Sequence, residues 1–190
     1  VIEEYGQKGK LAYKRYLARR FQRLFLPLLG MLLSVTAYIT LFQRDLLLNL
    51  RPWLLSSLGM VNNWWQISVG GSYFEQFYVQ SPFMHLWFLS VISQFYVIWP
   101  LIVLLLLALY KDKRIILYTA VGLSLFSALA MAMLYVPGED ASRVYYGTDT
   151  RLFSFMIGSS LSVVWPLERL NEPVSKRTKR RLTLAGFFSY

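Results

Sequence analysis

One histidine is the most versatile acid–base group in this sequence. The chain contains His85 and no second histidine, and it has no cysteine. An imidazole with an ordinary pKa of about 6.5 exchanges protons near neutral pH or holds a hydrogen-bond network together. An interfacial histidine that only anchors its helix looks the same in sequence, so both interpretations stand. A disulfide framework and a Cys/His metal site are excluded, and no bound metal is expected.

A second group of chemically capable residues precedes an apolar run further along the chain. Tyr146, Asp149 and Arg151 lie close together in sequence. A carboxylate orients a nearby imidazole, and an arginine holds that carboxylate or stabilises a developing oxyanion. A tyrosine relays an acyl group or donates a hydrogen bond if a base takes its proton. The simpler interpretation is an aromatic belt with a surface ion pair worth about 0 to 1 kcal/mol.

A basic segment, residues 8–23, precedes the first apolar run. Arg15, Arg19 and Arg23 recur at a spacing of four residues, and apolar side chains form another face. This pattern predicts an amphipathic helix that lies on the cytoplasmic membrane surface. Lipid anchoring alone explains the cluster, because each Lys or Arg near an anionic leaflet contributes about 1 kcal/mol.

Long uncharged runs must position these groups. The chain is 56% hydrophobic and 17% aromatic, which is too apolar for an ordinary soluble domain. The runs predict membrane-spanning helices at residues 24–43, 83–110, 115–136 and 152–167, with a fifth that begins at 182 and is truncated. The expected fold is an all-α polytopic bundle with about four complete spans.

Residues 44–82 do not fit a span. Arg51 and Pro52 interrupt the apolar run, and Trp64 and Trp65 favour the headgroup level. This segment is predicted to be extracytoplasmic, as an interfacial or re-entrant element.

The basic residues orient the chain. All lysines and arginines except Arg44, Arg51, Arg143 and Arg151 precede the first span, follow the second, or follow the fourth. The positive-inside rule places those three regions in the cytoplasm, and membrane lipid accounts for the net charge of +10 without a nucleic-acid partner. His85 and Arg151 then both lie near the outer interface and can meet if their helices pack.

The segment 81–101, SPFMHLWFLSVISQFYVIWPL, carries the most specific pattern. It resembles a motif of the acyltransferase-3 family of integral membrane O-acyltransferases. The matching residues are His85, Trp87, Leu89, Ser90, Val91, Gln94, Phe95, Tyr96, Trp99 and Pro100. Residues 14–27, 62–74 and 145–162 are similar to further segments of that family. The likeness therefore covers most of the chain as an interior piece, 1–190, of the family's membrane domain, and within the family it is greatest to Gram-positive peptidoglycan O-acetyltransferases.

The resemblance implies an enzyme of the bacterial cell membrane. It would move an acyl group, acetyl in the narrower likeness, from cytoplasmic acyl-CoA to a hydroxyl of an envelope carbohydrate, with no bound cofactor. The implied catalytic residues are His85, Tyr146, Asp149 and Arg151. The implied donor-binding residues are Arg19, Arg20 and Arg23, whose guanidinium groups pair with phosphates. Trp87, Ser90 and Gln94 would support the motif.

Two departures from the family qualify this assignment. Ile92 and Ser93 stand where many relatives have glutamate, so no carboxylate base is carried over to that place. The family's first helix, which has its own histidine, is absent, and these 190 residues alone are expected to be inactive. Two other classes remain: a transporter or flippase of lipid-linked envelope material, and a structural membrane subunit.

Overall fold

The computed structural model describes residues 13–47, 50–69, 81–110, 112 and 114–165, and these contain helices and turns without a strand. The elements are α2 (Tyr13–Phe42), η1 (Arg44–Leu47), α3 (Leu50–Leu58), α4 (Asn62–Val69), η2 (Met84–Leu86), α5 (Trp87–Tyr110), α6 (Arg114–Leu134), α7 (Ser142–Tyr146) and α8 (Thr148–Val164). The predicted all-α membrane fold is confirmed. The segment from 182 lies outside the described residues.

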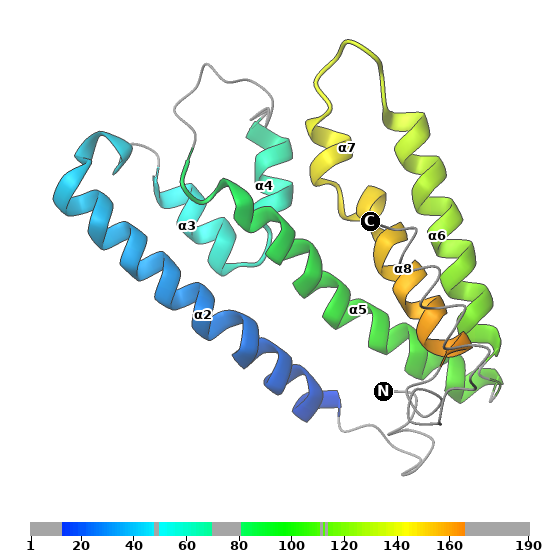
Figure 1. Ribbon diagram of the computed structural model, residues 1–190. Helices are drawn as coiled ribbons and strands as arrows, with labels where there is room; N and C mark the ends of the chain where they lie inside the picture. The colour runs from blue at the N-terminus through cyan, green and yellow to red at the C-terminus, as the bar shows by residue number, and fades with distance from the viewer. Residues whose placement is uncertain (1–12, 48–49, 70–80, 111, 113, 166–190) are drawn as a thin grey trace, which may run out of the picture.

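Within the described part of the chain, three helical segments are long and apolar enough to cross a membrane: Tyr13–Phe42, Met84–Tyr110 and Arg114–Leu134. The expected fourth span is also a helix, α8, but it has only 17 residues. As Figure 1 shows, α2, α5, α6 and α8 alternate in direction between the same two ends of the molecule. The short helices α3, α4 and α7 gather toward the end where α5 and α8 begin.

The basic segment differs from its predicted form. A separate surface helix was expected over residues 8–23, whereas residues 13–23 are continuous with the first span in the 30-residue helix α2. Pro27 lies inside this helix without ending it. At 1.5 Å per residue α2 is about 45 Å long, which exceeds the hydrocarbon thickness of about 30 Å. The basic turns therefore extend beyond the apolar part of the same rod. Residues 8–12 lie outside the described residues.

The helices α3 and α4 form a hairpin, in which α3 lies between α2 and α5 and α4 packs against α5 and α7 (Figure 1). The turn is a Schellman motif, in which Val61 N–H donates to the Ser56 carbonyl and Met60 N–H to the Ser57 carbonyl. Met60 occupies the left-handed position with φ of 55°, where glycine is usual. The hairpin tip at Met60 contacts Gln94, about two turns into α5. The segment 44–82 thus holds no span-length helix within its described residues, and its tip reaches well along α5.

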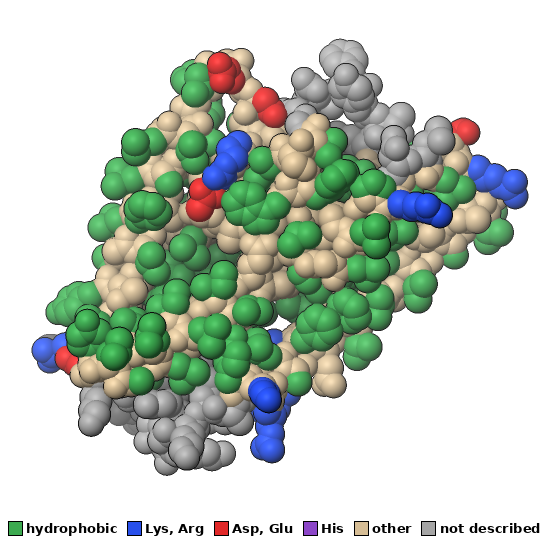
Figure 2. Space-filling model, turned by 180° about the vertical axis from the view of Figure 1, so that it is seen from behind, with side chains coloured by type: hydrophobic (Ala, Val, Ile, Leu, Met, Phe, Trp, Pro, Cys, Tyr) green, Lys and Arg blue, Asp and Glu red, His purple; other side chains and the backbone are tan. Residues whose placement is uncertain are grey.

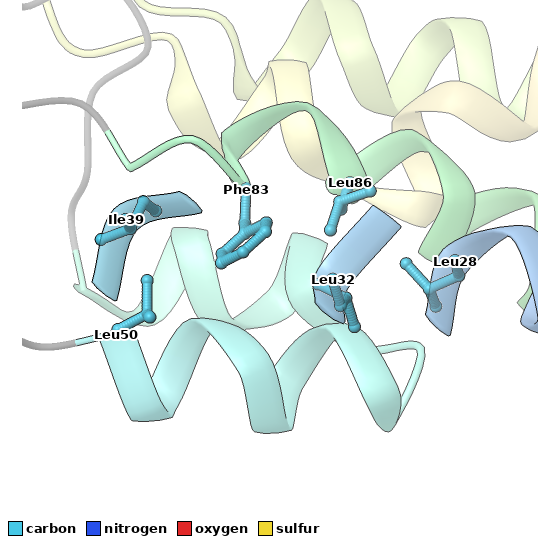
Figure 3. Packing of buried hydrophobic residues seen from close by; sticks show 6 residues of the cluster. All are labelled: Leu28, Leu32, Ile39, Leu50, Phe83 and Leu86. Carbon is cyan, nitrogen blue, oxygen red and sulfur yellow. The ribbon is translucent and has the colours of Figure 1, made fainter. Parts of the chain in front are cut away.

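Apolar contacts join the hairpin to the long helices. Leu28, Leu32 and Ile39 of α2 pack with Leu50 of α3, together with Phe83 and Leu86. Figure 3 shows Phe83 pointing from the chain before α5 toward α2 and α3. This cluster fixes the position of the hairpin against the start of the α5 motif.

The second half of the chain is held by α6 and α8, which pack along each other more extensively than any other pair of described elements. Ile116 and Ala120 of α6 pack with Met156 of α8 and Val103 of α5. Outward-facing surfaces remain apolar, and Figure 2 shows hydrophobic side chains over most of one face with few charges among them. Such a surface suits lipid contact.

Candidate functional site

The family-like motif, residues 81–101, meets the α7–α8 corner, residues 146–148, through Trp87. Trp87 is buried at the first residue of α5, and its ring centroid lies 4.9 Å from that of Tyr145 and 5.6 Å from that of Tyr146. Tyr146 is fully buried. His85 precedes Trp87 in η2 and is exposed. The structure therefore brings Trp87 and Tyr146 into direct contact and leaves the imidazole exposed, two residues before Trp87.

Arg151, in the first turn of α8, packs against the aromatic group, which consists of Trp87, Tyr145 and Tyr146. Its guanidinium carbon lies 4.7 Å from the ring centroid of Tyr145 and 5.7 Å from that of Trp87. The Arg151 Nε donates a hydrogen bond of 2.9 Å to the Tyr145 carbonyl. This bond and the cation–π contacts hold the planar guanidinium in one orientation at the motif.

Asp149 is bound by a different arginine from the neighbour considered in sequence. Arg143 of α7 forms a bidentate ion pair with Asp149, with N–O distances of 2.9 and 2.8 Å. Hydrogen bonding from Arg143 keeps the pKa of Asp149 below its ordinary value, so the carboxylate is charged at neutral pH. The guanidinium of Arg143 also lies over the ring of Trp64. Asp149 is therefore held away from the role of partner to Arg151, and it ties α8 to α7.

A partly buried polar network adjoins the aromatic group. Gln94 Nε2 donates to the Met60 carbonyl at 3.1 Å and to Asn63 Oδ1 at 3.0 Å. Its Oε1 accepts from Thr148 Oγ1 at 2.6 Å and from Trp64 Nε1 at 3.4 Å. Every hydrogen-bonding position of the Gln94 amide is thus occupied. Gln94 connects the hairpin tip, α4 and the start of α8.

Two asparagines complete the network. Asn63 Nδ2 donates to the Tyr146 carbonyl at 3.1 Å and to Thr148 Oγ1 at 2.9 Å. The backbone N–H of Asn62 donates to Ser90 Oγ at 3.1 Å. Both asparagines are fully buried. Gln94 and Ser90 of α5 are therefore both bonded to residues of the α3–α4 hairpin, and their role as support within the motif stays a prediction.

Sequence reasoning did not assign roles to Asn62, Asn63 and Thr148. The signal was present, because Asn62, Asn63 and Gln66 place three amide side chains on the short helix α4 of an otherwise apolar protein. Buried amides in a membrane protein are costly unless they are bonded, which marks such a cluster as functional or structural glue.

A cavity of about 560 Å³ lies between the basic half of α2, the hairpin tip and α5. Its lining is mostly apolar, with Arg20 and Gln94 among the polar residues. The Arg20 guanidinium carbon lies 5.6 Å from the ring centroid of Tyr16 and 5.1 Å from that of Tyr96. Arg19 and Arg23 are exposed and do not line the cavity. Of the three expected donor-binding arginines, Arg20 thus lines this cavity and Arg19 and Arg23 do not.

The relationship to known proteins agrees with the motif. Residues 6–190 match the acyltransferase-3 family, described as an acyltransferase domain. The chain belongs to this family. It is 40% identical over 189 residues to the peptidoglycan O-acetyltransferase OatA of Listeria monocytogenes. It is 39% identical to the putative peptidoglycan O-acetyltransferase YrhL of Bacillus subtilis and 33% identical to the O-acetyltransferase OatA of Staphylococcus aureus.

These similarities extend over the whole of this chain and about 30% of each of the first two relatives. The chain is therefore similar to one part of those longer proteins. No solved structure matches it significantly. As a member of the acyltransferase-3 family with several apolar helices of spanning length, the protein is a multi-pass membrane protein.

Proposed function

We propose that this chain forms part of a membrane O-acetyltransferase, which takes an acetyl group from cytoplasmic acetyl-CoA and delivers it to a hydroxyl of a cell-envelope carbohydrate. The observation that carries the proposal is the 40% identity over 189 residues to a peptidoglycan O-acetyltransferase. Peptidoglycan is accordingly the first acceptor to test.

The cavity supports the donor side of the proposal. It begins beside the basic turns of α2, where Arg20 contacts two aromatic rings, and it continues along apolar side chains to Gln94. A guanidinium suits the phosphates of a CoA donor, and an apolar channel suits its extended arm. Lipid anchoring explains Arg19 and Arg23 equally well, because both are exposed.

The aromatic group supports the acceptor side. In the proposed reaction His85 accepts the acceptor hydroxyl proton as the new C–O bond forms. The thioester C–S bond breaks, and the CoA thiolate leaves and takes up a proton. Arg151, held by Tyr145 and Trp87, stabilises the oxyanion, and Tyr146 donates a hydrogen bond. If Tyr146 instead relays the acetyl group, its phenol gives its proton to a base and takes the acetyl group as CoA leaves, and the acceptor hydroxyl then displaces the tyrosine oxygen.

The test uses the full-length protein in membranes, since this chain spans about 30% of its first relatives. Membranes are given radiolabelled acetyl-CoA and purified peptidoglycan, and base-labile label on the glycan is counted. Membranes that lack the protein provide the background. Label above background supports the proposal. Background label from correctly inserted protein, with peptidoglycan and with other envelope polysaccharides, would contradict it and favour transport of envelope material.

A further inference from the structure

The α7–α8 corner is held by side chains that come from two other elements. Asn63 of α4 donates to the carbonyl of Tyr146 and to Thr148 Oγ1. Thr148 in turn donates to Gln94 of α5. Three hydrogen bonds therefore fix a corner of three residues, 146–148, on the wall formed by α4 and α5.

The same network borders the cavity. Gln94 lines the cavity and accepts the Thr148 hydroxyl, and the buried ring of Tyr146 packs against Trp87. Hydrogen bonds through Thr148 and Asn63 thus link Gln94 in the cavity lining to the backbone of Tyr146. The Met60 carbonyl, which Gln94 also binds, comes from the left-handed turn at the hairpin tip. Residues kept in sparsely populated conformations often accompany functional sites.

We infer that Asn63, Gln94 and Thr148 are positioning residues for acetyl transfer, which link the lining of the donor cavity to the backbone of Tyr146. The inference rests on the proposed function. Asn63 and Thr148 do not line the cavity and act through the backbone or hydroxyl of the corner, whereas Gln94 lines the cavity and holds the Thr148 hydroxyl. Misplacement of a reacting group by about 1 Å lowers the rate by up to about 100-fold, so loss of this anchor should affect turnover more than donor binding.

Thr148 offers the cleanest test. Thr148→Val has nearly the same shape but removes both the bond to Gln94 and the acceptor for Asn63, whereas Thr148→Ser keeps the hydroxyl. Thr40→Val is the matched control, because the Thr40 hydroxyl bonds only to the Thr36 carbonyl of its own helix. Thr148→Ala is a second variant, since its smaller side chain leaves room for a water molecule if Thr148→Val does not fold.

Two measurements are made on the full-length protein in membranes. Acetyl transfer from labelled acetyl-CoA yields kcat and KM for the donor. The corner is followed separately by the maleimide labelling rate of Ala141→Cys, at the start of α7, in a background without other cysteines. We expect Thr148→Val, or Thr148→Ala if it is the variant that folds, to lower kcat about tenfold or more and to change KM less than about twofold. The same variant should speed maleimide labelling of the cysteine at position 141 about threefold or more. Thr148→Ser and Thr40→Val should match the parent within about threefold.

Several outcomes overturn the inference. An unchanged kcat in Thr148→Val and Thr148→Ala excludes a positioning role, and a lost kcat that Thr148→Ser fails to restore assigns the effect to packing. A rise in KM that matches the fall in kcat places the residue in donor binding. If the parent protein transfers no acetyl group, the proposed function fails, and the catalytic role fails with it. In that case, faster labelling of the Thr148→Val protein would show only that Thr148 anchors the corner structurally.

Discussion

Arg20 differs from the neighbouring arginines in what its guanidinium contacts. Arg20 lies over Tyr16 and Tyr96 at the edge of the cavity, whereas Arg19 and Arg23 are exposed. All three arginines carry the same charge and lie on the same helix, so charge alone does not distinguish them. The distinction lies in which side of α2 faces α5.

Arg20→Ala should therefore weaken use of the donor more than either neighbouring change. A hydrogen bond to a charged group is worth about 1.5–3 kcal/mol, which corresponds to a rise of about tenfold or more in KM for acetyl-CoA. Initial rates at varied acetyl-CoA, measured on full-length protein in membranes, give the comparison. Arg19→Ala and Arg23→Ala are the matched controls and should change KM by less than about threefold. Equal effects of all three changes would favour a general lipid anchor.

His85 is suited to a clean chemical test because its side chain is exposed. Removal of an exposed side chain costs little stability, so lost activity in His85→Ala reports on chemistry. We expect acetyl transfer to fall about 100-fold or more, the size of effect seen when a positioned acid or base is lost. Transfer to peptidoglycan is compared at equal amounts of inserted protein. Normal activity would remove the only histidine of this chain from the mechanism.

At the scale of elements, the α7–α8 junction depends on the absence of a side chain at Gly147. Its φ of −60° and ψ of 132° are accessible to any residue, so backbone freedom does not explain the glycine. Space does. A Cβ there would lie 2.3 Å from Arg143 Nη1 and 2.7 Å from both Asp149 Oδ1 and Thr150 Oγ1.

Gly147→Ala should therefore break the Arg143–Asp149 ion pair, because the flexible guanidinium is the group able to move away. We expect a lower thermal unfolding temperature than that of the parent protein, measured in detergent. Arg143→Met already lacks the ion pair, so adding Gly147→Ala to it should cost less than in the parent. Fully additive effects would show that the crowding at Thr150, and not the ion pair, accounts for the glycine.

The ion pair also has a defined pH dependence. The pKa of Asp149 is lowered by Arg143, so its stabilising contribution is present above the ordinary carboxyl pKa. The contribution is lost as the pH falls through the lowered pKa of the folded state. The junction therefore keeps this contact throughout the neutral range.

For the whole molecule, the arrangement of helices predicts which loops share a side of the membrane. α2, α5, α6 and α8 alternate in direction, and the α6–α7 loop lies at the end opposite the α5–α6 connection (Figure 1). The basic turns of α2 and Arg114 lie at the same end as the α5–α6 connection. The positive-inside rule then places Asp112 in the cytoplasm and Glu139 outside.

Cysteine substitution tests this orientation directly, because this chain has no cysteine of its own. In full-length protein without other cysteines, Glu139→Cys should react with a membrane-impermeant maleimide in intact cells. Asp112→Cys should react only after permeabilisation. The reverse pattern would invert the membrane orientation and place the aromatic group at Trp87 on the cytoplasmic side.

Much of the fold was predictable because the membrane imposes a local rule. A span needs about 20 residues with few charges, so uncharged runs locate the helices without knowledge of their neighbours. Pro52 and the polar residues around it argued against a simple span in residues 44–82, and the described residues there form the short helices of a hairpin. The motif around His85 and Trp87 likewise indicated the family before the packing was known.

The partners of individual side chains were not determined by sequence. In a soluble helix the apolar face shows which side is buried, but in lipid all sides are apolar, and helices associate through small and polar contacts. The rotation of each helix therefore had to come from the tertiary structure. That rotation decided that Asp149 pairs with Arg143, that Arg20 borders the cavity, and that Asn63 and Gln94 hold Thr148, because each of these contacts depends on which helix faces meet.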